Sequence, residues 1–231
     1  MPRASHEAVL FDLFDTLCFI DEPEYLRGKE RVAAALGVRF DPFLEAWIAC
    51  GDDAQSGVLP DIEARVRRAA AAAGGRPDDA AVERAVALAT RTMIRASALY
   101  PDVLPALGAV RGLRGLRVGL VSNASSVAAL LFDRLGLAGF FDHAAFSFRV
   151  GAVKPDPAIY LAACRALGVE ASRCLFVGDG NARELDGAKD LGMEAVRIER
   201  PLPLSRYRRG ESTRFDWSVG ALTDIPPLVR R

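Results

Sequence analysis

The chain has 231 residues, of which 51% are hydrophobic and 26% charged, and its 30 basic and 30 acidic side chains cancel. This composition is typical of a soluble globular protein and argues against disorder, while the cancelled charge gives no electrostatic reason to expect nucleic acid or an anionic membrane surface as a partner. The chain opens without the apolar span of a signal peptide, and no run reaches the ~18 apolar residues of a membrane helix, so we expect a cytoplasmic protein.

Short apolar stretches bounded by turn residues predict the strands of a buried parallel sheet at residues 8–11, 116–121, 174–177 and 194–198. Helical patterns lie between them. Residues 125–135 place their apolar side chains on one face and stop at a glycine, and residues 156–167 open with Asp-Pro and also stop at a glycine. This alternation predicts an α/β fold with a Rossmann-like parallel sheet.

The segment between the first two predicted strands has a different pattern. Residues 18–99 show helical periodicity, most clearly from residue 78 to 99, and no convincing strand. Because this segment interrupts the α/β pattern, we predict an α/β core of residues 1–17 and 100–231 with an inserted all-helical cap of residues 18–99, hinged near residues 19–22 and 100–102. The stretch RPLPLSRYRRG from Arg200 is expected to be a solvated basic loop.

Polar side chains follow three of the predicted strands. Asp12, Ser122-Asn123 and Asp179 each stand at a strand end, and the carboxyl ends of parallel strands border the ligand crevice of an open sheet. Lys154 lies in GAVKPDP, where the following proline favours an extended, stiff backbone. Each residue alone has an ordinary structural explanation, as a turn carboxylate or an exposed ammonium. Together they favour a functional site.

Four motifs, in order along nearly the whole chain, resemble those of the haloacid dehalogenase superfamily of hydrolases. They are FDLFDT at residues 11–16, LVSN at 120–123, GAVKPDPAIY at 151–160 and FVGDGNARELDGA at 176–188. The helical insertion is similar to the cap of the subgroup that contains haloacid dehalogenases, phosphoglycolate-type phosphatases and phosphonatases.

The resemblance implies a metal-assisted covalent mechanism. Asp12 is implied as the nucleophile, forming an aspartyl intermediate that water opens. Because two anions repel, the family's phosphatases place Mg²⁺ between carboxylate and phosphate, and the matching ligands here are Asp12, the main-chain carbonyl of Phe14 and Asp179. Glu184 is placed to hold the metal's water or to orient Lys154.

The remaining implied roles concern the substrate. Ser122 and Lys154 would donate to the developing negative oxygens, and Asn123 joins them as a substrate-binding residue. The family's phosphatases carry a general acid and base at the position of Phe14, which transfers no protons. The acid could be replaced by Asp15, by a water, or by a substrate with a good leaving group such as an acyl phosphate. A turn carboxylate is an equally good interpretation of Asp15.

Three functions stay open on these residues. Retention of Asp179 and Glu184 favours a Mg²⁺-dependent phosphatase acting on a small phosphorylated metabolite, as a monomer or homodimer. Phe14 instead resembles the aromatic residue of the metal-independent 2-haloacid dehalogenases, which would need a cationic clamp in the cap, from Arg27 or Arg65. A catalytically silent member that binds a ligand or a protein is the third.

Other residue types that often carry chemistry are expected to be structural. His6 and His143 stand far apart and outside the motifs, so a Ser-His-Asp triad has no base, and we expect both at the surface or in loops. Trp47 is expected to pack in the cap, where it could border the substrate. The cysteines lack a C-x-x-C spacing, which favours reduced, packed thiols over disulfides or zinc; they are Cys18, Cys50, Cys164 and Cys174.

Overall fold

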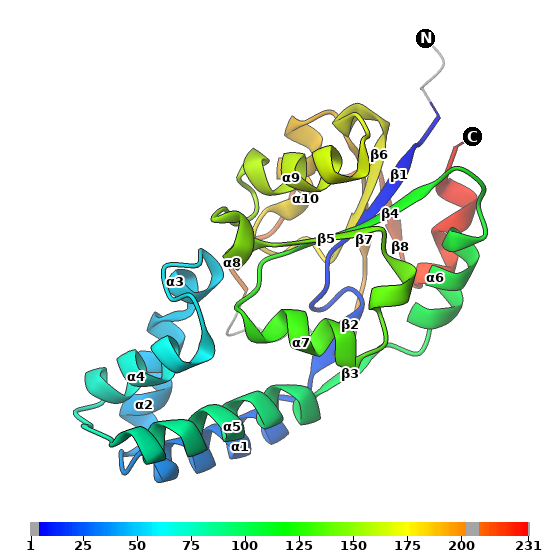
Figure 1. Cartoon of the computed structure of the whole chain (residues 1–231). Helices are drawn as coiled ribbons and strands as arrows, with labels where there is room; N and C mark the ends of the chain where they lie inside the picture. Colours follow the sequence, from blue (N-terminus) through cyan, green and yellow to red (C-terminus); the bar gives the residue numbers. More distant parts are fainter. Residues whose placement is uncertain (1–4, 202–207, 231) are drawn as a thin grey trace.

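A six-stranded parallel sheet forms the centre of the structure (Figure 1), a computed structural model that describes residues 5–201 and 208–230. The strand order is β5-β4-β1-β6-β7-β8. The strands are β1 (Ala8–Phe11), β4 (Arg117–Ser122), β5 (His143–Phe146), β6 (Cys174–Gly178), β7 (Glu194–Ile198) and β8 (Trp217–Val219). The predicted α/β fold with a parallel sheet is confirmed. Four of the six strands lie where the sequence predicted them, and these are β1, β4, β6 and β7. The patterns missed β5 and β8, which are short and only partly buried.

The order of the strands brings two distant carboxylates together. From β1 the sheet grows on one side through β4 to β5, and on the other side through β6 to β8. The chain therefore reverses its direction of growth between β1 and β6, the position where open α/β sheets bind ligands. Phe11 pairs with Val177, and the backbone N–H of Asp12 donates to the carbonyl of Val177 at 2.9 Å. Asp12 and Asp179 consequently leave neighbouring strands at the same edge.

Helices cover both faces of the sheet (Figure 1). Successive side chains of a strand point to opposite faces, so Leu10 packs in the core under α9 and α10, and Phe11 in the core under α6 and α7. These helices are α6 (Val103–Arg111), α7 (Val127–Arg134), α9 (Pro157–Leu167) and α10 (Glu184–Asp190). The two predicted helices correspond to α7 and α9. Asp156 caps the start of α9, and Gly168 ends it in the left-handed conformation at φ 70°.

The shorter helical elements connect these layers. They are α8 (Ser147–Val150), η1 (Ala138–Phe140), η2 (Ala171–Arg173), η4 (Leu222–Asp224) and η5 (Pro226–Leu228). In the part of the chain that the structure describes, no helix is long and apolar enough to cross a membrane.

A second group of helices lies to one side of the sheet, between β1 and β4 in the chain (Figure 1). They are α1 (Glu22–Ala35), α2 (Phe40–Ala49), α3 (Gly51–Gln55), α4 (Ile62–Ala72) and α5 (Asp79–Ala96). Four of them enclose a hydrophobic core of their own, as a separate cap requires. The boundaries 18–99 of that cap stay a prediction.

The sequence predicted no strand within residues 18–99, and this prediction is wrong. Two short strands, β2 (Cys18–Ile20) and β3 (Ser97–Leu99), pair antiparallel where the chain leaves and re-enters the sheet domain. The helical pattern predicted to residue 99 therefore ends at Ala96. Three-residue strands are too short to produce a recognisable alternation of polar and apolar side chains.

The remaining structural expectations have mixed outcomes. All four cysteines are buried free thiols, as predicted. His6 lies in the loop before β1, which agrees with one of its two expected settings, but it is buried and not at the surface. Its Nε2 atom lies 3.3 Å from Glu194, and its Nδ1 atom accepts from the backbone N–H of Arg230 at 3.1 Å. Burial lowers the pKa of His6, although Glu194 opposes the shift. His143 is half-buried at the start of β5 rather than in a loop.

Candidate active site

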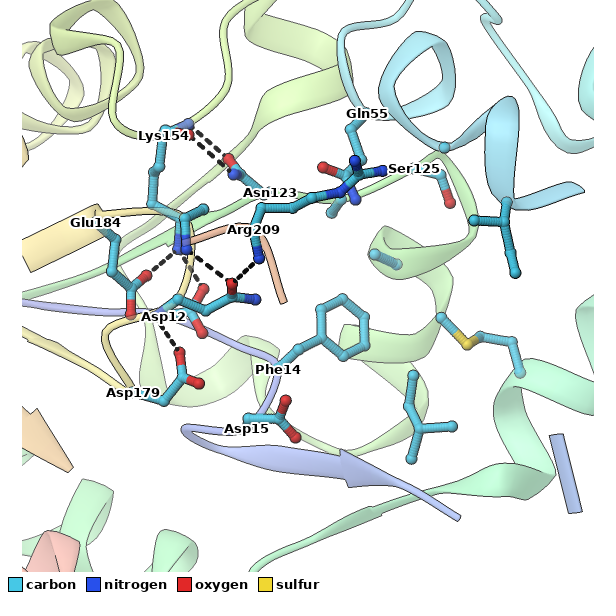
Figure 2. Close-up of a pocket in the computed structure, with 18 of the residues that line it drawn as sticks. Asp12, Phe14, Asp15, Gln55, Asn123, Ser125, Lys154, Asp179, Glu184 and Arg209 are labelled. Atoms are coloured by element: carbon cyan, nitrogen blue, oxygen red, sulfur yellow. Dashed lines mark hydrogen bonds and ion pairs between the residues drawn. The ribbon is translucent and has the colours of Figure 1, made fainter. Parts of the chain in front are cut away.

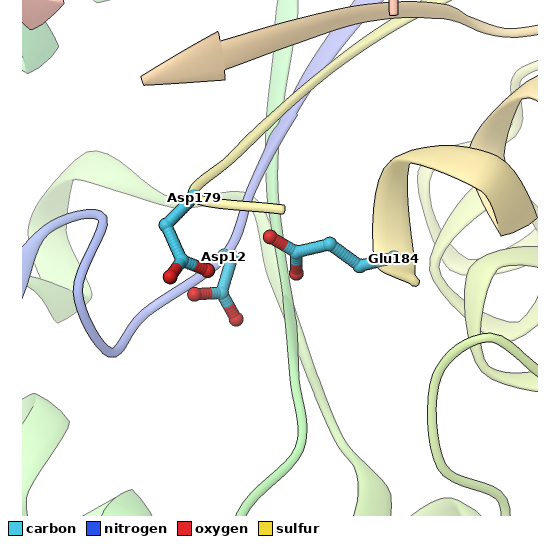
Figure 3. A group of neighbouring side chains, drawn as sticks. All are labelled: Asp12, Asp179 and Glu184. Atoms are coloured by element: carbon cyan, nitrogen blue, oxygen red, sulfur yellow. The ribbon is translucent and has the colours of Figure 1, made fainter. Parts of the chain in front are cut away.

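Three buried carboxylates converge at the edge of the sheet (Figure 3). Asp12 follows β1, Asp179 follows β6, and Glu184 is the first residue of α10. Each can place one oxygen within 4.8 Å of the others. Hard carboxylate oxygens in this arrangement suit a small divalent cation such as Mg²⁺.

The loop between β6 and α10 is shaped to bring Glu184 back to the sheet. The backbone N–H of Gly180 donates to Glu184 Oε1 at 3.0 Å, and Gly180 has a φ of +90°, which favours glycine. At Gly178, an added Cβ atom would lie 2.1 Å from Glu184 Oε1. Only glycine at the end of β6 therefore leaves room for the carboxylate.

Lys154 joins two of the three carboxylates (Figure 2). Its Nζ atom forms an ion pair with Asp12 and lies 2.5 Å from Glu184 Oε2. Asn123 holds the backbone of Lys154, because its Oδ1 atom accepts from the Lys154 N–H at 2.7 Å and its Nδ2 atom donates to the Lys154 carbonyl at 3.3 Å. The motifs implied that Asn123 and Lys154 both bind substrate. They did not indicate that Asn123 positions the backbone of Lys154.

Burial dominates the electrostatics of the cluster. Burial raises the pKa of Asp12, and the nearby charge of Asp179 raises it further, while Lys154 offsets part of the shift. Burial likewise raises the pKa of Glu184 well above its ordinary value. For Lys154 burial alone would lower the pKa, but Asp12 and Glu184 outweigh it and the pKa is raised. The carboxylates repel one another in a poorly solvated site, and a divalent cation would relieve that repulsion.

Phe14 and Asp15 lie in the turn that follows Asp12, and both line the same cavity as the carboxylates. Asp15 has a left-handed backbone at φ 58°, and its N–H donates to the carbonyl of Cys18 at 2.7 Å. The structure therefore shows Asp15 both as a residue of a tight turn and as a neighbour of the site. Its role as a replacement acid stays a prediction.

Ser122 is fully buried at the end of β4 and is not among the residues that line the cavity. Its hydroxyl finds no hydrogen-bond partner within residues 5–201 and 208–230. A buried hydroxyl without a partner costs about 1–3 kcal/mol, which an incoming acceptor would recover. Its predicted donation to substrate oxygens remains a prediction.

A cavity of about 180 Å³ extends from the carboxylates to the inserted helices. Among the residues of the inserted helices that line it are Tyr25, Ile48, Arg65 and Met93. Arg65 stacks 4.0 Å from the ring of Trp47 and donates to the Trp47 carbonyl at 2.8 Å. Trp47 thus supports the cavity wall from behind.

The two arginines considered as a cationic clamp have different surroundings. Arg65 lines the cavity, whereas Arg27 does not and is paired with Glu24 at 3.0 Å on an exposed face of α1. Of these two arginines, Arg65 is therefore the one placed to meet a ligand in this cavity.

The solvated basic loop predicted after residue 200 holds for Pro201, Arg209 and Gly210, which are exposed, but it is wrong for Arg200 and Arg208. Arg200 donates to the carbonyl of Thr16 and pairs with Asp102 at 3.0 Å, and Arg208 Nη1 lies 2.5 Å from Asp179 Oδ2. Residues 202–207 lie outside the described chain. The basic composition of this stretch suggested solvent exposure, and nothing in its spacing indicated that Arg208 would contact Asp179.

A family comparison decides the relationship that these motifs and this fold suggest. A model of the haloacid dehalogenase-like hydrolases matches residues 6–192. The chain belongs to this family. This haloacid dehalogenase-like protein is accordingly a hydrolase.

Individual relatives of this hydrolase include both phosphatases and dehalogenases. It is 34% identical over 158 residues to a glyceraldehyde 3-phosphate phosphatase from Methanopyrus kandleri, covering 68% of this chain and 67% of the relative. A HAD phosphatase from Thermococcus onnurineus superposes with a TM-score of 0.69 at 26% identity, over 96% of this chain and 97% of that one. A 2-haloacid dehalogenase from Pseudomonas syringae pv. tomato gives a TM-score of 0.72 at 26% identity and the same coverage. The fold alone therefore does not separate the two chemistries.

Proposed function

We propose that this hydrolase is a Mg²⁺-dependent phosphatase of a small phosphorylated metabolite, with Asp12 as its nucleophile. The observation that carries the proposal is the convergence of Asp12, Asp179 and Glu184 in one buried cluster of oxygens. Such a cluster next to the nucleophile has a direct electrostatic reason when the reacting group is an anion. A halogenated carbon carries no charge that a cation must neutralise. The phosphatase relative supports the same choice.

The carboxylate cluster fits a divalent cation by its chemistry. Asp12, Asp179 and Glu184 offer hard, buried oxygens close to one another, and Phe14 could add its main-chain carbonyl. When bound, Mg²⁺ would lower the repulsion between the Asp12 carboxylate and the phosphate oxygens.

The chain's own residues would carry the covalent steps. An oxygen of Asp12 attacks phosphorus while the bond from phosphorus to the substrate oxygen breaks, which leaves a phosphoryl group on Asp12. Water then attacks phosphorus, releasing inorganic phosphate and regenerating the carboxylate. Lys154 stands next to Asp12 and would donate to the developing negative oxygens, with its backbone held by Asn123. The unpartnered hydroxyl of Ser122 is a second candidate donor.

The part of the cavity lined by the inserted helices suggests the rest of the substrate. Ile48 and Met93 give it apolar walls, and Arg65 supplies a positive charge. A short phosphorylated metabolite with an apolar body and a polar or anionic end would match these surroundings. Phe14 provides no proton, so substrates whose leaving group is stable as an anion should react fastest.

Phe14 is also the observation that favours the second candidate, a 2-haloacid dehalogenase, because a departing halide needs no proton. In that reaction Asp12 would attack carbon, and Arg65 would bind the substrate carboxylate. Hydrolysis of the resulting ester would need no metal.

An assay with three substrates separates these functions. Purified protein is incubated with p-nitrophenyl phosphate, acetyl phosphate or 2-chloropropionate, each with Mg²⁺ and with a chelator. We expect release of phosphate only with Mg²⁺ and no release of chloride. Chloride release that is indifferent to the chelator would instead establish the dehalogenase. Turnover of none of the three would favour the catalytically silent member.

A further inference from the structure

Arg208 occupies the outer side of the carboxylate cluster. Its Nη1 atom lies 2.5 Å from Asp179 Oδ2, and its Nε and Nη2 atoms donate to Glu211 at 2.6 and 2.8 Å. The side chain of Arg208 is 15% exposed and that of Asp179 is 6% exposed, so their ion pair is only weakly screened by solvent. This is a cationic contact on a candidate metal ligand.

The backbone around Arg208 is hydrogen-bonded to the segment that contains the loop between β6 and α10. Residues 208–214, which we term the strap, run beside residues 179–186. The N–H of Arg209 donates to Asn181 Oδ1 at 2.7 Å, and the N–H of Ser212 donates to the carbonyl of Gly180 at 2.8 Å. Further along, the N–H of Arg214 donates to Asp186 at 2.9 Å. These contacts place the guanidinium beside Asp179 without help from a ligand.

Two basic side chains pair with the three carboxylates of the cluster. Lys154 bridges Asp12 and Glu184, and Arg208 covers Asp179. Counting Glu211, which Arg208 also contacts, four carboxylates and two basic side chains carry two negative charges, and a divalent cation would neutralise them. Without Arg208 the loaded cluster would keep one negative charge, and a phosphate dianion would then meet repulsion.

We propose that Arg208 is a built-in counter-cation of Asp179 that weakens divalent-cation binding and, in return, strengthens the binding of the phosphate group by the loaded site. The proposal rests on the proposed function, since it concerns the same metal cluster. Arg208 acts through Asp179 and is a positioning residue, not a catalytic one. A purely structural role, in which Arg208 only aims the Asp179 carboxylate, has the opposite consequence, because losing it would weaken metal binding.

Calorimetric titration with Mg²⁺ distinguishes these roles. For Arg208→Gln we expect Mg²⁺ to bind roughly tenfold more tightly than to the wild type, because a unit charge a few ångströms from the ion is removed. Arg208→Lys keeps the charge and should bind Mg²⁺ as the wild type does. The matched control is Arg214→Gln, on the same strap, whose contacts are with Asp186 and Asp190 outside the cluster. Its Mg²⁺ affinity should not change.

A second measurement uses inorganic phosphate as the probe. With Mg²⁺ saturating, inhibition by phosphate should weaken several-fold in Arg208→Gln and stay unchanged in Arg214→Gln. Unchanged or weaker Mg²⁺ binding by Arg208→Gln, with circular dichroism showing a folded protein, would overturn the proposal. If Arg208→Gln does not fold, a change of Mg²⁺ affinity in Arg208→Lys as large as expected for charge removal would overturn it. Failure of the wild type to bind Mg²⁺ would overturn the proposed function as well.

Discussion

Replacing Asp12 by asparagine is expected to reduce turnover of every phosphate substrate by at least about 10³-fold, since the amide cannot form the covalent intermediate. The substitution is nearly isosteric, and Lys154 keeps its contact with Glu184. Because burial raises the pKa of Asp12, replacing its charge should not destabilise the fold. Initial rates with p-nitrophenyl phosphate and saturating Mg²⁺ provide the measurement.

Asp21→Asn is the matched control for this change. Asp21 is an exposed carboxylate that caps α1, accepting from the N–H of Glu24 at 2.9 Å. Asparagine caps helices about as well as aspartate, so this variant should keep both activity and stability. Wild-type turnover by Asp12→Asn would show that Asp12 is not the nucleophile. An equal loss of turnover in Asp21→Asn would point to a general effect of losing a carboxylate.

Phe14→Asp is expected to raise activity toward alkyl phosphates, which are poor leaving groups. A positioned general acid typically raises the reaction rate by ~10²–10⁴-fold. The surroundings of residue 14 are not arranged for an acid, so we expect a gain at the lower end, about 10²-fold. Phe14 lines the cavity in the turn that follows Asp12, so its replacement can face the substrate. Comparing kcat/KM for an alkyl phosphate with that for p-nitrophenyl phosphate isolates the leaving-group effect.

Phe14→Asn provides the control, because it has the same shape as the aspartate variant without a transferable proton. It should show no gain with alkyl phosphates. Phe14 also packs against the main hydrophobic core, so thermal unfolding of both variants must be compared. If Phe14→Asp is slower than the wild type on every substrate while remaining folded, the missing-acid explanation of Phe14 is wrong.

The positions of the site residues were predictable where they follow from strand order. Apolar runs that end at Asp12 and Asp179 predict neighbouring strand ends, and the sheet brings these ends together through the pairing of β1 with β6. Lys154 was assigned to the site through its motif, and contact with Glu184 was one of two expected roles of that glutamate, whereas the ion pair between Lys154 and Asp12 was not predicted. The contact between Lys154 and Glu184 depends on the curvature of the loop after Gly178, which sequence periodicity does not encode.

Long-range contacts of surface-type residues were not predictable. Arg208 belongs to a basic, proline-containing stretch whose composition favours solvent, yet it pairs with a carboxylate 29 positions away. His6 is buried for a similar reason, because Arg230 and Glu194 close over it from distant parts of the chain. Ion pairs of this kind leave no periodic pattern, so only the assembled structure shows them.

Asp12 either carries a phosphoryl group during turnover or it does not, and mass spectrometry of rapidly quenched protein decides between the two. Protein mixed with p-nitrophenyl phosphate and Mg²⁺ should show one added phosphoryl group, located on Asp12 by fragmentation, and none when a chelator replaces the metal. Turnover without any adduct on Asp12, or the same adduct in the presence of the chelator, would contradict a metal-assisted aspartyl nucleophile.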